Sequence, residues 1–523
     1  MIKNLLCFGI LFTIIVNTRA QTFNVSWGER VKITNEFDDA VPIGNGKQIV
    51  FKIKQPKRMF SMNIPENYLM IVNAKMETEL ESEEIKLDEK NGTIKGFEKY
   101  GNNIFLMYEA YDKETKTTSE YALKVNEKTL ALTNKKTLGT FEADNRNDQA
   151  KSLYKLSADS TKILLFSEGP ERRKENKHLF ITVFDTDLNK IWKKDVELPI
   201  LEKFISIYDQ DITNDGNVFV ATKVYDKEVT RETVREDGSK IPSYVYKINV
   251  FTKESAKPKE IAFNLNNLFI QGTKLTYSKN GSITVAGLYK TKSNGNLNGV
   301  FYGTLDANST EIKNPKIVPF DSEIIRLVDK DRFGTDKSKD PGLYTSFRIK
   351  HIMRRSNGSV DLISEYYRWD AYTTTNSRGG MQNHVRYEYG DIVNTNIDKE
   401  GKAVFTRIPK DQLYIDSEKF QGYFPFLYND KLVLLYNDDK DNVDRDLEKR
   451  PDDVLRFDKS VFVAATIDAK GVLTRQAIFS NDDENYVTIP RNTTCISPTK
   501  YLITADLTKL FKKGTRFGFL EVK

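Results

Sequence analysis

Apolar residues in this chain occur in short runs of strand length, separated by clusters of turn-forming residues. The clearest example is the stretch from Ser152 to Leu198, which holds four such runs. β-Branched and aromatic residues fill the runs, while Asp, Ser and Asn mark the breaks, so the stretch is predicted to form β-strands joined by turns. Four strands in a unit of about 50 residues, repeated along a chain, are typical of β-propeller blades.

Weaker copies of this pattern recur along the whole chain. The expected complete units are Val41 to Leu87, Gly96 to Phe141, Ser152 to Leu198, Ser206 to Phe263, Phe269 to Phe320, Thr345 to Pro409 and Phe420 to Phe479. Three further runs follow, around Tyr486–Ile489, Lys500–Leu507 and Arg516–Val522, and they leave the last unit one strand short. The pattern therefore predicts an all-β propeller of seven or eight four-stranded blades, with eight preferred.

The missing strand is expected at the other end of the chain. The spacing of Asn24, Trp27 and Val31 repeats that of Asn189, Trp192 and Val196 in the outer strand of the third unit. An N-terminal strand in the last blade would close the ring and cover two open sheet edges.

The lengths of the turns predict that the two faces of the propeller differ, with short turns on one face and long loops on the other. Asn-Gly or Asp-Gly pairs, as at Asn45-Gly46 and Asp215-Gly216, predict tight hairpins between first and second strands. Long segments fall between second and third strands, at residues 168–177, 226–243, 368–386 and 437–459. Loops built on a rigid scaffold often carry binding function, although they are also tolerated as insertions.

The first twenty residues have the features of a secretion signal. Lys3 precedes an apolar run from Leu5 to Val16, and Thr18 to Ala20 supplies small residues for cleavage before Gln21. We therefore expect residues 1–20 to be a signal peptide, residues 21–523 to be a single propeller domain, and the protein to be exported to the periplasm or beyond. No later run reaches the length of about 18 apolar residues that suggests a membrane span.

The net charge and the cysteine content exclude some kinds of function and of stabilisation. Removing Lys3 and Arg19 lowers the net charge from +6 to +4, which argues against a nucleic-acid binder. Cys495 is then the one remaining cysteine, so no internal disulfide can form. Its apolar strand context predicts a buried, inert thiol.

The run from Ser157 to Ser167 resembles the TolB-type propeller repeat, in which a Ser-x-Asp turn precedes an apolar strand. The sixth and seventh units resemble exported bacterial propeller-like proteins of unknown function. These resemblances imply the fold; they bring no catalytic residue to positions in this chain. The Ser157 run also lacks the Pro-Asp-Gly core of the TolB-type turn, and no blade ends in a WD40-type Trp-Asp pair.

Motifs of familiar enzymes are absent from the sequence. The three histidines, His178, His351 and His384, lack metal-ligand spacing, and neither a zinc-protease helix nor a nucleophile elbow occurs. Catalysis by a pair of carboxylates stays open, because 74 acidic residues offer many pairs. No cofactor is expected.

The most unusual segment is the long loop of the sixth unit. One of the three tryptophans lies there among tyrosines and arginines, residue types that bind sugars, peptides and protein partners. The candidate binding residues are Arg368, Trp369, Tyr372, Arg378, His384 and Arg386. The alternative is a β-hairpin whose aromatic residues pack across its strands.

The loop of the seventh unit carries alternating carboxylates, the raw material of a calcium site. Asp439, Asp441, Asp444 and Asp446 are the candidate ligands. However, the glycine and the twelfth-position glutamate of an EF-type loop are missing, and basic residues are interleaved, so a solvated charged loop is preferred.

Two functional hypotheses follow. The first is a non-enzymatic binding or scaffold module of the cell envelope, with a protein or glycan partner and no nucleic acid. The second is a carbohydrate-active enzyme, a lyase or hydrolase, with its site at the propeller axis. The missing catalytic motifs favour the first.

Overall fold

The computed structural model describes residues 21–523, apart from 29–30, 33–34, 55–65, 74, 76, 90–91, 146–150, 227–232, 235–239, 264, 266–267, 278–280, 307, 330–339, 376–378 and 508–513. The expected signal peptide, residues 1–20, lies outside these described residues.

Eight antiparallel sheets of four or more strands follow one another along the described chain. Each sheet is a blade, numbered in chain order. Blade one contains β3 (Asn35–Gly44), β4 (Lys47–Lys54), β5 (Glu66–Val72) and β6 (Thr78–Glu81). Blade two contains β7 (Gly92–Tyr100), β8 (Asn103–Asp112), β9 (Thr117–Val125) and β10 (Leu132–Glu142). Blade three contains β11 (Lys151–Leu156), β12 (Ile163–Glu168), β13 (Asn176–Phe184) and β14 (Lys190–Leu201). Blade four contains β15 (Ile205–Ile212), β16 (Val218–Tyr225), β19 (Tyr244–Phe251) and β20 (Lys259–Phe263).

Blade five contains β21 (Phe269–Tyr277), β22 (Ile283–Lys290), β23 (Gly299–Leu305) and β24 (Lys313–Pro319). Blade six contains β25 (Phe347–Arg354), β26 (Val360–Thr375), β27 (Met381–Ile397) and β28 (Ala403–Ile408), with β29 (Gln412–Ile415) added on β27. Blade seven contains β30 (Phe424–Tyr428), β31 (Lys431–Asp438), β32 (Val461–Ile467) and β33 (Leu473–Ser480). Blade eight contains β34 (Val487–Thr488), β35 (Thr494–Ser497), β36 (Lys500–Asp506), β37 (Gly514–Val522), β1 (Phe23–Trp27) and β2 (Val31–Lys32).

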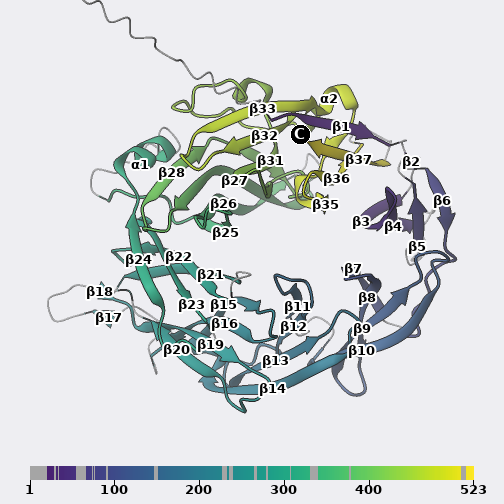
Figure 1. Cartoon of the computed structure of the whole chain (residues 1–523), viewed down its shortest axis with the longest axis horizontal. Helices are drawn as coiled ribbons and strands as arrows, with labels where there is room; N and C mark the ends of the chain where they lie inside the picture. Colours follow the sequence, from purple (N-terminus) through teal and green to yellow (C-terminus); the bar gives the residue numbers. More distant parts are fainter. Residues whose placement is uncertain are drawn as a thin grey trace, which may run out of the picture.

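The blades are arranged in a ring around a common axis (Figure 1). The first strand of a blade, such as β7, β11 or β25, lies toward the axis, and the last, such as β10 or β14, lies toward the rim. The eight-bladed β-propeller expected from the repeat pattern is confirmed.

Closure of the ring by the N-terminal strand is also confirmed. Strand β1 pairs antiparallel with the C-terminal strand β37, with Val25 opposite Leu520 and Trp27 opposite Gly518. The ring of Trp27 lies 5.4 Å from that of Phe479 in blade seven. The first and last of the described strands therefore share one sheet.

The inner edge of blade eight differs from the expectation. The run Tyr486–Ile489 contributes only the two-residue strand β34, and β35, which the pattern did not suggest, also pairs with β36. A 3-10 turn at Pro490–Asn492 separates the two strands, since proline cannot donate a hydrogen bond to a sheet. Cys495 lies in β35 and is exposed, so the prediction of a buried thiol is wrong.

The core is divided into layers between neighbouring blades. One layer joins Phe166 and Trp192 of blade three to Ile212 and Phe251 of blade four. The second and third strands are the most buried, and every residue of β32 is buried. Two-sided burial explains why these strands appear in the sequence as unbroken apolar runs rather than as alternating patterns.

Short elements decorate the ring. They are helices α1 (Ser322–Asp329) and α2 (Asn481–Glu484), the strand pair β17 (Thr233–Val234) and β18 (Lys240–Ile241), and 3-10 turns such as η1 (Glu202–Phe204). Within the described chain, none of the helices has the length and apolar character needed to span a bilayer.

Candidate functional site

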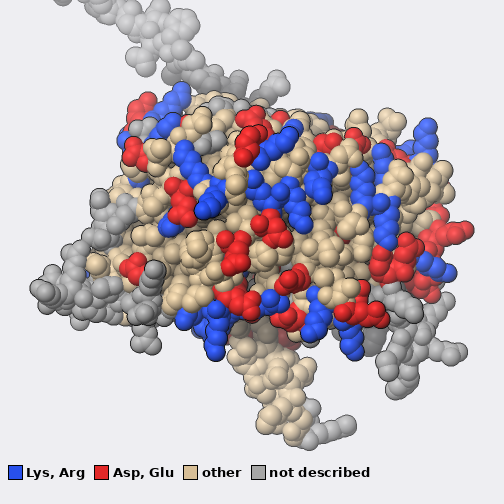
Figure 2. Space-filling view, turned by 90° about the horizontal axis from the view of Figure 1, so that it is seen from below, with Lys and Arg blue, Asp and Glu red and all other residues tan. Residues whose placement is uncertain are grey.

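The long loop expected in the sixth unit is a two-stranded arm. Strands β26 and β27, with 16 and 17 residues, extend past the rest of their blade. Pairing of β25 with β26 reaches only Tyr366, and pairing of β28 with β27 begins at Ile392. Strand β29 pairs with the base of this extension, from Tyr389 to Arg386 of β27, and beyond Arg386 the two strands continue alone. We call Tyr367–Thr375 together with Met381–Tyr389 the arm. A narrow projection of this kind stands out beyond one face of the ring in Figure 2.

One face of the arm is charged and internally paired. Arg368 donates to Oδ1 of Asp370 from Nε at 3.1 Å and from Nη2 at 2.9 Å, while Arg386 donates to Oδ2 at 2.9 Å. The hydrogen bond from Arg386, together with that from Arg368, lowers the pKa of Asp370 below its usual range. These two arginines are therefore committed to a carboxylate within the arm.

The same face holds Tyr372 and His384. Nδ1 of His384 lies 2.7 Å from Oδ2 of Asp416, and Nε2 lies 3.1 Å from the hydroxyl of Thr374. The rings of Tyr372 and His384 are 5.5 Å apart. Hydrogen bonding to His384 lowers the pKa of Asp416. The imidazole thus has partners on both nitrogens and holds the arm against the segment that follows β29.

The other face of the arm is apolar and carries Trp369. Alternate residues of a strand point to opposite faces, so Trp369 lies away from Arg368 and Asp370. It sits opposite Tyr387 in the register, with Ala371 opposite Val385. Trp369 is 58 % exposed, and Met381 near the tip is 83 % exposed. We call this the apolar face: it carries Trp369, Ala371, Val385 and Tyr387 and, nearer the tip, Met381 with the polar residues Thr373, Thr375 and Asn383. Val385 and Tyr387 are half-buried, and the other members are exposed.

The structure therefore divides the predicted binding residues between two surfaces. Arg368, Tyr372, His384 and Arg386 lie together on the charged face, and Trp369 lies on the apolar face. Arg378 lies outside the described residues. The sequence pattern placed all six on one segment but did not distinguish the faces, since this needs the register of the two strands.

A buried polar network fixes the base of the arm. The ammonium of Lys410 donates to Glu365 at 2.9 Å, to Gln412 at 3.1 Å and to the carbonyl of Tyr389 at 3.2 Å. Tyr389 in turn donates to Glu418 at 2.7 Å, and burial raises its pKa well above the usual range. Sequence reasoning missed these residues, because the network joins segments that a local pattern does not connect.

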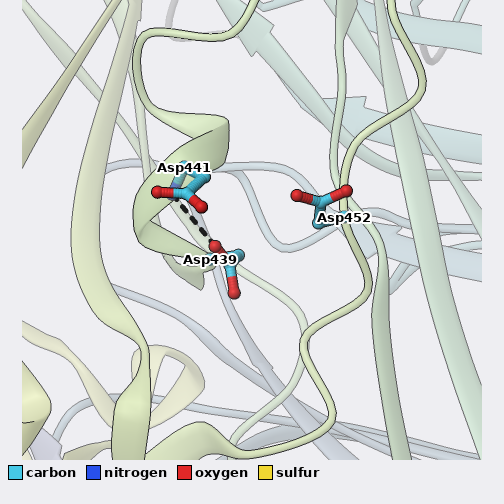
Figure 3. A group of neighbouring side chains, drawn as sticks. All are labelled: Asp439, Asp441 and Asp452. Atoms are coloured by element: carbon cyan, nitrogen blue, oxygen red, sulfur yellow. Dashed lines mark hydrogen bonds between the residues drawn. The ribbon is translucent and has the colours of Figure 1, made fainter.

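Three carboxylates gather in the long loop of blade seven. Side-chain oxygens of Asp439, Asp441 and Asp452 lie within 4.8 Å of one another, as Figure 3 shows. The backbone N–H of Asp441 donates to Asp439 at 2.9 Å, and Arg445 pairs with Asp452. Asp444 and Asp446, two of the four predicted ligands, are not members of this group, whereas Asp452 was not predicted. With one carboxylate capping a turn and another paired with arginine, the cluster by itself establishes no cation site.

The two other histidines lie in strands outside the arm. His178 pairs with Asp195 across β13 and β14. His351, in the inner strand β25, has its ring 5.4 Å from that of Tyr423. Desolvation, with smaller contributions from Lys274 and Lys350, lowers the pKa of His351 to about 4. His351 is therefore neutral near pH 7.

No family model matches the chain, and the search of curated proteins found no match either. Among solved structures, the chain is similar to the β-propeller domain of the trilobed protease from Pyrococcus furiosus, with 12 % identity, 87 % of this chain and 98 % of that chain covered, and a TM-score of 0.33. It is similar to the WD40 domain of SCAP from fission yeast, with 9 % identity, 96 % and 94 % covered, and a TM-score of 0.36. It is also similar to the polysaccharide lyase Uly1, with 10 % identity, 95 % and 99 % covered, and a TM-score of 0.38. These similarities concern the fold alone, and the propeller assignment stands on the strand order described above.

Proposed function

We propose that the protein is a non-catalytic binding module of the cell envelope, which engages a protein partner through the apolar face of the arm. The observation that carries the proposal is the exposure of Trp369 and Met381 on a hairpin that projects from a rigid ring. Tryptophan is enriched among the residues that dominate binding energy at protein interfaces, and methionine is enriched at interfaces more generally. The export signal expected in residues 1–20 supports an envelope location.

The composition of this face favours a protein over a glycan. Sugar recognition combines an aromatic platform with hydrogen-bonding groups that fix the hydroxyls. Around Trp369, the neighbouring side chains on the same face are Ala371, Val385 and Tyr387. The charged groups of the arm point to the other face and are paired there. The part of the face around Trp369 is therefore mainly apolar and complements an apolar patch on another protein.

The test is the substitution Trp369→Ala, with Leu455→Ala as a matched control. Leu455 is 57 % exposed in the loop of blade seven, so its loss removes a similarly exposed apolar side chain elsewhere. Partners recovered from an envelope extract with the unchanged protein are purified, and their affinity is measured for all three proteins. Trp369→Ala should weaken binding by roughly 30-fold, about 2 kcal/mol, and leave the melting temperature nearly unchanged.

Two outcomes would reject the arm as the docking surface. If Trp369 acts only as packing within the hairpin, the substitution lowers the stability of the arm and leaves the affinity unchanged. A loss of affinity that is the same for Leu455→Ala would also reject the arm as the docking surface.

One observation favours the second hypothesis, a carbohydrate-active enzyme with its site at the axis. Tyr208, Arg348 and His351 lie on the inner strands β15 and β25, and a histidine with a tyrosine and an arginine can serve acid–base chemistry on sugars. Incubation with a panel of polysaccharides tests it. Depolymerisation that His351→Ala abolishes would support the enzyme, and intact polysaccharides would leave the binding module as the proposal.

A further inference from the structure

A cavity opens where the inner strands of blades four, five and six meet. Its volume is about 470 Å³, and it is lined by residues of β15, β21 and β25 that include Tyr208, Gly272, Lys274, Arg348 and Lys350. The volume lies within the range of small-molecule sites. Since the three strands are consecutive inner strands of the ring, the cavity faces the axis (Figure 1).

The cavity is shaped by three aligned β-bulges. The register shifts between Ile207 and Asp209 in β15, between Gln271 and Thr273 in β21, and between Ile349 and His351 in β25. The extra residues are Tyr208, Gly272 and Lys350, and each is the fourth residue of its strand. Bulges redirect side chains and are frequent beside functional sites. All three extra residues line the cavity.

Gly272 keeps the middle of the cavity open. Its φ of +79° is in the left-handed region, and a Cβ placed on it would meet no atom within 4 Å. A side chain at this position would therefore extend into free space between Tyr208 and Lys350 rather than into packed protein. The absence of a side chain leaves that space to a ligand.

Positive charge in the cavity exceeds negative charge. Lys274 lies 3.6 Å from Asp209, whose other oxygen accepts the backbone N–H of Leu275 at 2.8 Å. Arg348 donates to backbone carbonyls, including that of Phe347 at 2.9 Å, and the ammonium of Lys350 lies 4.9 Å from the ring centre of Tyr367. Within the described ranges, neither Arg348 nor Lys350 has a carboxylate oxygen within 4.0 Å. Three cations thus share one nearby carboxylate.

Blade two provides an internal comparison. Lys95 is the bulged residue of β7 and also the fourth of its strand, but its ammonium lies 2.8 Å from Glu109 and 3.4 Å from Glu120. Both carboxylates that pair with Lys95 belong to its own blade, whereas Lys350 forms no ion pair in the described chain and is attracted by Glu365 of its blade only at longer range. An unpaired cation is therefore a property of the blade-six cavity and not of the bulge as such.

The pKa values of Arg348 and Lys350 are both lowered, as expected for cations without an ion-pair partner. Desolvation lowers the pKa of Arg348. It also lowers the pKa of Lys350, where attraction by Glu365 and Glu418 opposes the shift and repulsion from Arg491 and Arg348 adds to it. A bound anion would offset both the desolvation and the mutual repulsion of these cations.

We propose that this cavity is a binding site for a small polyvalent anion, one that carries two or more carboxylate or phosphate groups, held by Lys274, Arg348 and Lys350. Arginine presents a planar fork that matches such groups, and the lysines supply compact charges on either side. Tyr208 supplies an apolar wall with a hydroxyl at its end. This site lies at the axis, beside the base of the arm, where Lys350 contacts Tyr367, and it does not depend on the partner proposed above.

Calorimetric titration of the full chain with citrate, pyrophosphate and acetate tests the proposal. Citrate or pyrophosphate should bind more tightly than acetate, and the tighter of the two identifies carboxylate or phosphate as the preferred group. Lys350→Met should weaken that binding by about tenfold, and adding Arg348→Met should weaken it further, because each removes a charged hydrogen-bond donor. Lys350→Arg, which keeps the charge, should retain most of the affinity.

Lys95→Gln is the matched control, since it removes the equivalent but already paired lysine and should leave anion binding unchanged. Melting curves verify that each variant is folded. Lys350 is only half-buried and has no ion pair in the described chain, so Lys350→Met should not affect folding. If the double variant melts at a lower temperature, the affinity of Lys350→Met is compared with that of the unchanged protein on its own. The proposal is overturned if no polyvalent anion binds better than acetate, if Lys350→Met binds as the unchanged protein does, or if Lys95→Gln weakens binding equally.

Discussion

Removal of residues 21–34 should destabilise the whole propeller, because this segment provides the outer strand of blade eight. Strand β1 lies beside β37 over five residue pairs. Further backbone hydrogen bonds, from Thr22 to Lys523 at 3.1 Å and from Gly28 to Phe517 at 3.0 Å, continue the pairing at both ends. Without the segment, β37 becomes an exposed edge and the covalent chain no longer closes its own ring.

The magnitude follows from what β1 buries. Its burial alternates, with Phe23, Val25 and Trp27 half-buried and Asn24 and Ser26 exposed. Full burial of a large apolar side chain contributes about 1.5–3 kcal/mol, so three half-buried ones contribute about 3–4 kcal/mol together. Each backbone hydrogen bond of the pairing contributes about 0.5–1.5 kcal/mol after exchange with water, but the entropy of ordering the strand offsets most of this, so we assign about 1 kcal/mol to the pairing as a whole. The expected loss of about 4–5 kcal/mol is a large part of a typical folding free energy of about 5–15 kcal/mol.

Urea unfolding is the appropriate assay. Unfolding entropy grows with chain length at about 2.1 cal/mol/K per residue, so the melting temperature of so long a chain moves only a few degrees. Hydrogen exchange adds a local measurement, because the amides of β37 that pair with β1 should lose protection first. Trp27→Ala should reproduce part of the loss, since Trp27 contacts Phe479 and Arg516. Asn24→Ala, on the exposed side of the same strand, is the control and should be neutral.

If the truncated protein unfolds at the same urea concentration as the protein that begins at Gln21, the N-terminal strand does not stabilise the ring. Unchanged exchange at Leu520 and its neighbours would show that the pairing of β1 with β37 is not maintained in solution. A loss with Asn24→Ala equal to that with Trp27→Ala would show that packing of β1 on blade seven is not the cause.

Two further predictions concern buried charges. Arg355 is fully buried and donates to Asp361 at 2.6 and 3.0 Å and to the carbonyl of Asp430 at 2.8 Å, so Arg355→Met should cost about 3–5 kcal/mol in urea unfolding. Adding Asp361→Leu should not restore this loss, because Asp361 also accepts hydrogen bonds from the buried amides of Asn394 and Asn396, at 2.8 and 2.9 Å, which would lose this acceptor. Burial raises the pKa of Asp438 to about 7, while the unfolded carboxyl titrates near 4. Between those values the folded state retains a proton that the unfolded state has lost, so stability should fall as the pH rises from about 4 to 7. Asp438→Asn should flatten this part of the pH profile, and an unchanged profile would place the titration elsewhere.

The repeat pattern predicted the fold because each blade is specified locally. Inner runs such as Ile163–Phe166 are apolar on both sides, and short turn motifs separate them. At Asn45-Gly46 both residues have positive φ, +51° and +74°, which is the backbone that such a hairpin turn requires. Even the closing strand could be recognised, because Asn24 and Trp27 repeat the spacing found in an outer strand elsewhere.

The candidate sites could be predicted from the sequence only in part. The arm was recognised as unusual from its aromatic and basic content, but the separation of Trp369 from Arg368 and Arg386 depends on the register of two strands. Cys495 shows the same dependence: an apolar context suggested burial, and the position of β35 at the inner edge of its sheet leaves the thiol exposed.

The sequence alone predicted the class of fold and the closure of the ring, and it narrowed the number of blades to seven or eight, because these features depend on patterns within single repeats and at the chain ends. Only the tertiary structure decided which charges have partners. Lys95 and Lys350 occupy the same position in two similar blades, yet one lies beside two carboxylates and the other above a tyrosine ring at the edge of a cavity. That difference arises from side chains brought together across strands and between blades, and their separation in the sequence carries no signal of the contact.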